Sequence, residues 1–439
     1  MDAAVAERPY RPAVRLALAD LMLAAAVGAL SGALALGTRA LLLAITSLTT
    51  NNHAFAGAFA VDTPNYGSLG VATRLVLPLG GGLLCSWLIV ALAPETHGQG
   101  VAPVQAAVRR DGPQIRARVI VVKPVVTGLT IGAGGSAGLV APVVHIGAAL
   151  GSKCAAALRL PADRARLLVG CGAAAAIAAL FGAPIGAGCF ALEVVLATVA
   201  VRSVASVAVA ALAGATVSRL VLGGAPMLDV PPVDLTAIGL LLAAVLGVLC
   251  SFVACLFVRT FHLFAEVLAR AWRGPQWLLP AACGALLGLL FLVAPELWGI
   301  GLPVVQAALT GHYAIIVLLA LLVGKIVANS LTVNYLGSGG SFTPLLFVGA
   351  MFGSAFGHVA ATLAMPGGPL LYGLAAMAAV VAAATRAPFA AAFIVIEMSG
   401  TVSVALPIAV AVIASTATSH LFCGATIYLK RVGAATGAR

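Results

Sequence analysis

Two glycine-rich interruptions, each leading into an apolar segment, place backbone N–H groups where they could bind an anion. The first runs through residues 135–142 and its apolar segment begins near Val140, while the second begins near Phe342. Each start is followed within two residues by a proline suited to a first helical turn. Neither interruption contains lysine or arginine, and a helix N-terminus presents unpaired N–H groups with a partial positive charge. We therefore expect two helix ends that hold a small anion strongly enough to dehydrate it and weakly enough to release it.

A glycine-rich break can also mark a tight contact between packed helices. Two breaks in register, together with a third break at residues 97–103, favour the ligand interpretation over packing alone. Gly132, Gly134 and Ala137 also match the G-x-G-x-x-A pattern of dinucleotide sites. That pattern needs a preceding strand and an acidic residue about 20 positions on, and neither is present, so a nucleotide site is excluded.

Carboxylates and imidazoles within the apolar segments are the other candidates for chemistry. Glu193 and Glu397 lie where a carboxylate is costly, and such residues are functional candidates by default. Either could relay protons, but because they occupy equivalent places in the two halves of the chain we favour a role in bracing neighbouring helix ends. We expect His145 to be a hydrogen-bonded packing residue, and His97 is a candidate polar lining residue near the inner mouth of a path.

The segments that must position these groups are apolar and often short. The chain has 439 residues, of which 62% are hydrophobic and 8% charged, and its mean hydropathy is +1.13. Soluble domains carry about a quarter charged residues, so a multi-span membrane protein is the class that fits. Some apolar runs, such as 142–157, are shorter than the ~20 residues of a full span, whereas 184–222 is predicted as one segment. Broken helices at membrane depth are tolerated where they line a cavity or are buried in protein.

The formal net charge is +11, and the basic residues lie in short connecting segments such as 109–118 and 159–166. The positive-inside rule explains this pattern and predicts that both termini are cytoplasmic. No basic patch has interleaved aromatic residues, which excludes nucleic acid as a partner. The eight cysteines are scattered singly and form no C-x-x-C pair, so we expect neither a metal nor a cofactor.

The chain repeats itself at an offset of 202 residues, the separation of Lys123 from Lys325. The two halves share a lysine, a Gly-Ser pair, a proline and two further glycines in the same order: Lys123, Gly135, Ser136, Pro142, Gly147 and Gly151 match Lys325, Gly337, Ser338, Pro344, Gly349 and Gly353. We therefore expect one transmembrane domain over residues 1–439. It contains a first repeat at 13–222 and a second at 236–428, and a short cytoplasmic tail follows at 429–439.

Three ordered motifs resemble the signatures of the CLC family of chloride channels and chloride/proton antiporters. Residues 98–104 (GQGVAPV) resemble G-S/H-G-V/I-P-E-V, residues 138–142 (GLVAP) occupy the place of G-R/K-E-G-P, and residues 339–344 (GGSFTP) match G-G-x-F-x-P. Tyr428 stands where the family's final-helix tyrosine is expected. The resemblance covers nearly the whole chain and is to the prokaryotic type, without cytoplasmic CBS domains.

This resemblance implies an all-α multi-pass fold of two antiparallel repeats of broken and tilted helices, in the cell (inner) membrane. It also implies a homodimer with one pore per subunit. Chloride would be bound by the backbone N–H groups of Ser341 and Phe342 and by the hydroxyl of Tyr428. Gln99 stands where the family has serine or histidine; its amide can donate to an anion, but its size leaves the anion preference open.

Two departures from the family pattern bear on proton coupling. Val140 replaces the glutamate that competes with chloride and carries protons in the family's antiporters, and the helix-end amides of Leu139 and Ala141 flank it. Val194 replaces the antiporters' inner proton glutamate. Valine can neither bear a negative charge nor pass a proton, so the simplest expectation is passive anion movement that is not coupled to protons.

Two alternatives within the same fold stay open at this point. One is a chloride/proton antiporter that uses a non-standard proton route, and the other is a member selective for another anion such as fluoride or nitrate. A membrane-embedded enzyme would need a nucleophile–base pair or a metal cluster. The H-E-x-x-H element is absent from the sequence, and we do not expect an enzyme.

Overall fold

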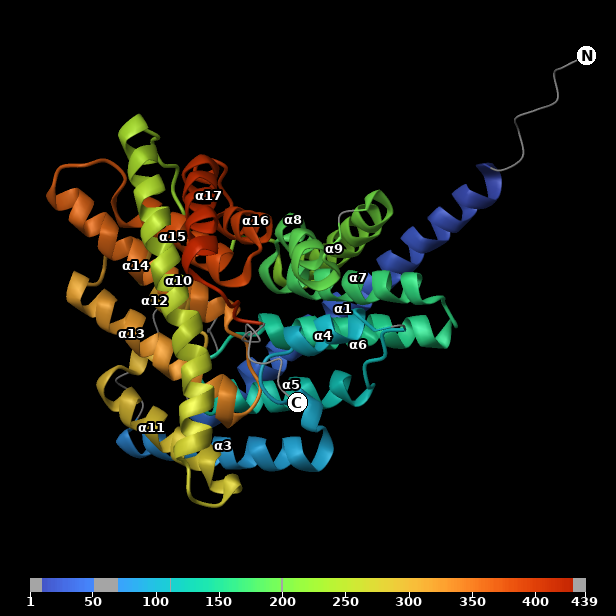
Figure 1. The fold of residues 1–439 in the computed structure, drawn as a ribbon, viewed down its shortest axis with the longest axis horizontal. Helices are drawn as coiled ribbons and strands as arrows, with labels where there is room; N and C mark the ends of the chain where they lie inside the picture. The colour runs from blue at the N-terminus through green and yellow to red at the C-terminus, as the bar shows by residue number, and fades with distance from the viewer. Residues whose placement is uncertain (1–9, 51–69, 111, 199, 429–439) are drawn as a thin grey trace, which may run out of the picture.

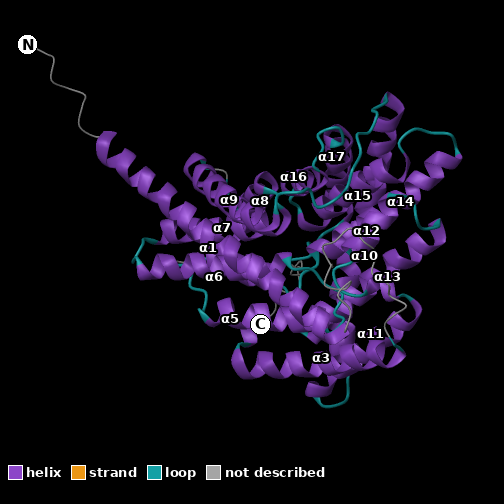
Figure 2. Cartoon of the chain, turned by 180° about the vertical axis from the view of Figure 1, so that it is seen from behind, coloured by secondary structure: helices purple, strands orange, loops and turns teal. Residues whose placement is uncertain are grey.

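The computed structural model describes residues 10–50, 70–110, 112–198 and 200–428, and in this part of the chain every regular element is a helix. Eleven of the described helices are long and apolar enough to cross a membrane. The all-α multi-pass fold is therefore confirmed (Figures 1 and 2). The tail predicted at 429–439 lies outside the described residues.

The first half of the chain alternates long helices with short ones. Its elements are α1 (Tyr10–Thr50), α3 (Val71–Leu92), the 3-10 helix η2 (Pro94–Thr96), α4 (Val101–Val108), α5 (Arg118–Gly132), α6 (Val140–Ala157), α7 (Ala162–Phe181), α8 (Pro184–Phe190), the π-helix η3 (Ala191–Leu196) and α9 (Val201–Leu222). The segment predicted as continuous at 184–222 is instead broken, because Ala197 adopts the left-handed conformation (φ 50°) and ends η3.

The α-helices of the second half follow the same order as those of the first half, but the π-helix stands at a different place. It comprises α10 (Ala237–Ala271), the 3-10 helix η4 (Gln276–Leu278), α11 (Leu279–Val293), the 3-10 helix η5 (Pro295–Leu297), α12 (Leu302–Leu309), α13 (Ile315–Leu331), the π-helix η6 (Thr332–Leu336), α14 (Phe342–Thr362), α15 (Gly368–Thr385), α16 (Pro388–Ser399) and α17 (Ala405–Phe422). In Figure 1 most helices of the first half, blue to green, lie on one side of the molecule, and those of the second, yellow to red, lie on the other. An exception is α3, which packs against α11 (Figures 1 and 2).

Small residues allow the central helices of each half to pack backbone against backbone. Where α6 crosses α7, a Cβ on Gly147 would lie 2.2 Å from the carbonyl oxygen of Gly172. Where α14 crosses α15, a Cβ on Gly353 would lie 2.1 Å from the carbonyl oxygen of Tyr372. Such close approach is how membrane helices gain van der Waals contact without a hydrophobic driving force. As a result α7 and α15 form the core, and 83% of the residues in an 18-residue apolar stretch of each helix are buried.

Hydrogen bonds between the halves are reciprocal. The Oγ1 of Thr130 accepts from the N–H of Ser338 (3.1 Å), and the Oγ1 of Thr332 accepts from the N–H of Ser136 (3.0 Å). Thr130 and Thr332 are equivalent positions of the two halves, and so are Ser136 and Ser338, so the same contact is made twice. This is the pattern of a self-complementary twofold contact. Two antiparallel structural repeats related by a pseudo-twofold axis account for this pattern.

Candidate functional site

The three glycine-rich breaks meet at the centre of the molecule. Gly138 and Gly340 exchange two backbone hydrogen bonds of 2.8 Å, which joins the segments that precede α6 and α14. The N–H of Gly98 donates to the carbonyl of Gly337 (2.7 Å), which adds the segment that precedes α4. Irregular backbone at membrane depth must find its hydrogen bonds inside the protein, and here the three breaks satisfy one another. A Cβ on Gly138 would lie 2.5 Å from Thr343 Oγ1, so the close approach requires glycine there.

Two helix N-termini begin at this junction. The structure begins α6 at Val140 and α14 at Phe342, as predicted from the glycines and prolines. No side chain at the N-cap position, Leu139 or Ser341, accepts a hydrogen bond from either first turn. Leu139, Val140, Ala141, Ser341 and Phe342 are all buried. The partial positive charge of both helix ends therefore lies inside the protein, without a capping side chain.

Gln99 and Tyr428 lie together beside the N-terminus of α14. The Nε2 of Gln99 donates to Ser341 Oγ (3.2 Å) and lies 3.5 Å from the carbonyl oxygen of Ile427. The Oε1 of Gln99 and the hydroxyl of Tyr428 are buried and have no hydrogen-bond partner among the described residues. Buried polar atoms are almost always satisfied, so two orphans in one place indicate a site for a ligand or for ordered water.

A cavity of about 240 Å³ adjoins these groups, and we call it the Gln99 cavity. It is lined by Gln99, Tyr428, His97, His262 and Asn334 with five further residues. The structure therefore places His97 on the wall of a cavity beside Gln99, the place expected for a polar lining residue. Sequence reasoning missed His262 and Asn334, because they lie on α10 and η6, far along the chain from the motifs.

Aromatic rings form an apolar wall next to the same helix end. The ring of Phe190 packs edge-on against the rings of Phe342 (5.9 Å between centroids) and Tyr428 (6.3 Å). The ring of Phe181 lies 6.2 Å from that of Phe342. An apolar wall around a few directed N–H and O–H groups is typical of sites that bind a desolvated ligand.

Both positions that the resemblance assigns to proton glutamates are apolar in the structure. Val140 is fully buried, and Val194 lies in η3 with 6% of its surface exposed. The carbonyl of Val194 accepts a hydrogen bond from Gln105 Nε2 (2.8 Å). Sequence reasoning missed Gln105, although the repeat carries a signal for it. Its counterpart on α12, Gln306, uses its amide in the same way, on the carbonyl of Asp229 (3.0 Å).

Glu193 and Glu397, which the sequence places in apolar segments, are only partly buried, and each caps a helix N-terminus in the opposite repeat. Glu193 accepts from the N–H groups of Phe389 (3.2 Å) and Ala390 (2.8 Å) at the start of α16. Glu397 accepts in the same way from α8, at Ile185 (3.0 Å) and Gly186 (2.8 Å). This arrangement is the bracing role that we favoured from the symmetric positions of the two acids. A carboxylate at a helix N-terminus is stabilised by the N–H groups and by the helix dipole.

Two buried lysines hold the backbone that leads into the breaks. The Nζ of Lys123 donates to the carbonyls of Thr96 (2.8 Å) and Gly98 (2.9 Å), next to Gln99. Lys325 makes the equivalent contacts in the second repeat, to Leu297 (3.3 Å) and Gly299 (2.9 Å). Sequence reasoning used these lysines only to mark the repeat. Their place in apolar segments, where a charge is costly, was the signal that could have revealed them.

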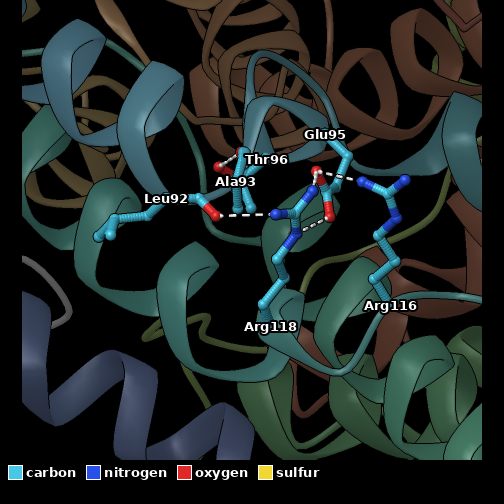
Figure 3. Close-up of polar contacts among 6 residues, drawn as sticks. All are labelled: Leu92, Ala93, Glu95, Thr96, Arg116 and Arg118. Atoms are coloured by element: carbon cyan, nitrogen blue, oxygen red, sulfur yellow. Dashed lines mark hydrogen bonds and ion pairs between the residues drawn. The ribbon is translucent and has the colours of Figure 1, made fainter.

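An ion-pair cluster of Glu95, Arg116 and Arg118 also holds the backbone near Lys123 (Figure 3). These three residues lie outside the candidate membrane spans. Arg118 donates from Nε (2.6 Å) and Nη2 (2.9 Å) to both carboxylate oxygens of Glu95, and from Nη1 to the carbonyl of Leu92 (3.2 Å). Arg116 lies 3.7 Å from the same carboxylate. Partial burial works to raise the pKa of Glu95, but the hydrogen bonds and the charges of Arg118 and Arg116 outweigh it and lower that pKa. The cluster therefore ties η2 to the start of α5.

His145 does not behave as predicted. The residue is 2% exposed, as expected of a packing histidine, but its Nδ1 has no hydrogen-bond partner among the described residues, so the expected hydrogen bond is missing at this nitrogen. The physical reason is that the ring lines a cavity and packs against Gly100, where a Cβ would lie 2.6 Å from that of His145.

A membrane protein with inverted repeats and two helix N-termini meeting at its centre has the architecture of transporters and channels with a midplane site. Residues 81–420 match the family model described as voltage gated chloride channel. The chain belongs to this family.

The relatives agree with that assignment, and the solved structures agree with the fold. The chain is 28% identical over 423 residues to the "H(+)/Cl(-) exchange transporter ClcA" of Citrobacter koseri, which covers 94% of this chain and 87% of the relative. The fold of this chain is similar to that of a slow cyanobacterial Cl−/H+ antiporter, with a TM-score of 0.82 and 22% identity. The match covers 93% of this chain and 96% of that one. A CLC-type fluoride/proton antiporter is similar with a TM-score of 0.77 and 24% identity, and the match covers 96% of this chain and 98% of that one.

Proposed function

We propose that the chain moves small anions, chloride first among them, across the membrane, and that it does so without coupling to protons. The observation that carries this proposal is that two helix N-termini are capped by carboxylates of the protein, whereas two others, which are buried, are not. The ends of α8 and α16 are capped by the protein's own carboxylates, Glu397 and Glu193. No side chain among the described residues caps the ends of α6 and α14. A buried helix N-terminus that no carboxylate of the protein caps is suited to binding a small anion from solution.

The donors around α14 can coordinate such an anion. The backbone N–H groups of Ser341 and Phe342 and the hydroxyl of Tyr428 surround the bound ion, and the amide of Gln99 lies at its inner side. All are neutral donors, so binding is strong enough to replace part of the hydration shell without trapping the ion as a lysine or arginine would. On the outer side, the N–H groups of Leu139 and Ala141 flank Val140 at the end of α6.

Absence of coupling is inferred from the side chains along this path. Val140 and Val194 cannot take up a proton, and the hydrogen bond to the carbonyl of Val194 comes from an amide, Gln105. Glu193 and Glu397 each accept two backbone hydrogen bonds, so a proton on either would cost a helix its cap. The relatives named above are exchangers by name, and the two valines are the specific reason to propose a different behaviour here.

The assembly and topology follow from the family resemblance and the charge pattern. We propose a homodimer with one anion path per subunit, in the inner membrane, with both termini in the cytoplasm. In this orientation the Gln99 cavity is the cytoplasmic mouth of the path. Transport, rather than enzymatic chemistry, is the proposed activity.

The test is chloride efflux from liposomes that contain the purified full chain, with external pH recorded at the same time. We expect chloride efflux that requires a potassium shunt, which shows that the movement is electrogenic, and no proton movement in either direction. Protein-free liposomes provide the baseline. Uphill proton movement driven by a chloride gradient would overturn the uncoupled mechanism, and lack of anion efflux with any halide or nitrate would overturn the transport proposal itself.

A further inference from the structure

A second cavity, of about 500 Å³, lies between η2, α4 and the connection from α4 to α5. We call it the His145 cavity. Its polar lining consists of Glu95, Arg110, Gln114 and Arg116 towards the surface and of His145, which is buried. Its volume is within the range of about 300–1,000 Å³ that is typical of small-molecule sites.

His145 supplies an unsatisfied polar group to this cavity. Its side chain is 2% exposed, and its Nδ1 has no hydrogen-bond partner in the described part of the chain. A buried polar atom without a partner costs about 1–3 kcal/mol, so a ligand whose polar atom reached this ring would recover that cost. His145 is one of the residues that line this space, which is large enough for a ligand.

The charge balance at the mouth of the cavity favours an anion. The carboxylate of Glu95 is engaged on both oxygens by Arg118, so its charge is already compensated (Figure 3). Arg116 lies 3.7 Å from that carboxylate, and no carboxylate in the described residues pairs with Arg110. The guanidinium groups of Arg110 and Arg116 are therefore a positive surplus, and a guanidinium fork fits the oxygens of a phosphate or carboxylate.

The remaining walls are apolar and fixed in place. Pro94, Pro103, Ala106 and Ile115 are among the apolar lining residues, so a ligand needs a compact apolar body as well as its charged group. The wall that carries Ile115 is anchored, because its N–H donates to Ser152 Oγ (3.0 Å), which in turn donates to the carbonyl of Pro113 (2.8 Å). An anchored wall reduces the ordering cost of binding.

We propose that the His145 cavity binds a phosphomonoester with a compact apolar body. The phosphate lies beside Arg110 and Arg116, the body lies against the prolines, and a polar atom of the ligand reaches His145. The ligand is either a soluble phosphate compound or a phosphate lipid headgroup, since both present the same chemistry. This site is distinct from the anion path and does not depend on the proposed transport function.

Binding is tested by isothermal titration of the purified full chain in detergent with phenyl phosphate as the probe. We expect saturable binding that is at least tenfold weaker in the double variant Arg110→Gln/Arg116→Gln. The matched control is Arg109→Gln/Arg159→Gln, which removes two surface charges that do not line the cavity and leaves binding unchanged. His145→Phe, which keeps a ring and removes the nitrogens, weakens binding as well. No saturable binding, or an equal loss in the control, overturns the proposal.

Competition experiments distinguish a soluble phosphate ligand from a lipid headgroup and test whether the phosphate group is required. Displacement of phenyl phosphate by inorganic phosphate supports a soluble ligand, and displacement by dihexanoyl phosphatidic acid alone supports a lipid headgroup. Displacement by benzyl alcohol, which has the apolar body but no anion, overturns the assignment of a phosphate. Because the readout is binding and not chloride flux, this proposal and the transport proposal fail independently.

Discussion

Replacing Gln99 with serine is expected to speed anion movement. The Nε2 of Gln99 reaches Ser341 Oγ at 3.2 Å and lies 3.5 Å from the carbonyl of Ile427. The side chain therefore connects the segment before α4 to the start of α14, at the wall of the Gln99 cavity. An anion that leaves Ser341 towards this cavity must displace the amide. A neutral hydrogen bond contributes about 1 kcal/mol net, and the second contact is too long to add much. Removing a barrier of about 1 kcal/mol raises a rate by about fivefold.

The assay is the initial rate of chloride efflux from liposomes at matched protein content. Gln105→Ser is the control, because Gln105 lies on α4, directly after the segment that carries Gln99, but donates to the carbonyl of Val194 and does not line the Gln99 cavity. We expect about a fivefold gain for Gln99→Ser and none for the control. A folded Gln99→Ser variant with efflux at or below that of the parent protein would refute the idea that this amide obstructs the path.

Three further perturbations test other parts of the site. Val140→Glu puts a carboxylate at the N-terminus of α6, where the ionised group competes with the anion. Chloride efflux should therefore be low at neutral pH and recover below the pKa of the new carboxyl. The control variant Val140→Leu should show no such pH dependence. Glu193→Gln keeps one acceptor oxygen and loses a charge-assisted hydrogen bond, so thermal unfolding should reveal a loss of about 1.5–3 kcal/mol, while a changed proton flux would contradict a purely capping role. Lys123→Met should lower both stability and chloride affinity, because it removes the hydrogen bonds that hold the backbone beside Gln99. The matched variant Lys325→Met should lower stability alone. Equal losses of chloride affinity in the two variants would contradict this reasoning.

Local signals account for the parts of the site that could be predicted from the sequence. The starts of α6 and α14 follow from glycines and a proline within eight residues, and the structure begins both helices where predicted. The repeat was visible because its marker residues are fixed by packing and by helix ends, and these requirements are the same in both halves. The membrane class followed from composition, since no soluble fold buries so much apolar surface.

Contacts between residues far apart in the chain could not be predicted in this way. Gln99 and Ser341 are 242 positions apart, and their hydrogen bond depends on how α4 and α14 pack, which no local pattern encodes. The role of Lys123 depends on the direction of the carbonyl of Gly98. The environment of His145 depends on a cavity that forms only when several elements pack together. The break at Ala197 was missed because alanine is a strong helix former and no glycine or proline marks the turn.

That break is explained by the cap that it accompanies. A non-glycine residue in the left-handed region costs on the order of 1–3 kcal/mol, and Ala197 adopts it directly after η3. In the same short segment, Glu193 makes two charge-assisted hydrogen bonds to the start of α16, each of which contributes about 1.5–3 kcal/mol. The cap therefore outweighs the strain. In the second repeat Glu397 lies in a regular α-helix that ends at Gly400, where the left-handed conformation has no such cost, and it caps α8 in the same way. The two repeats reach one electrostatic arrangement by different backbone routes, which indicates that the capped ends of α8 and α16, and by contrast the uncapped ends of α6 and α14, are what the fold maintains.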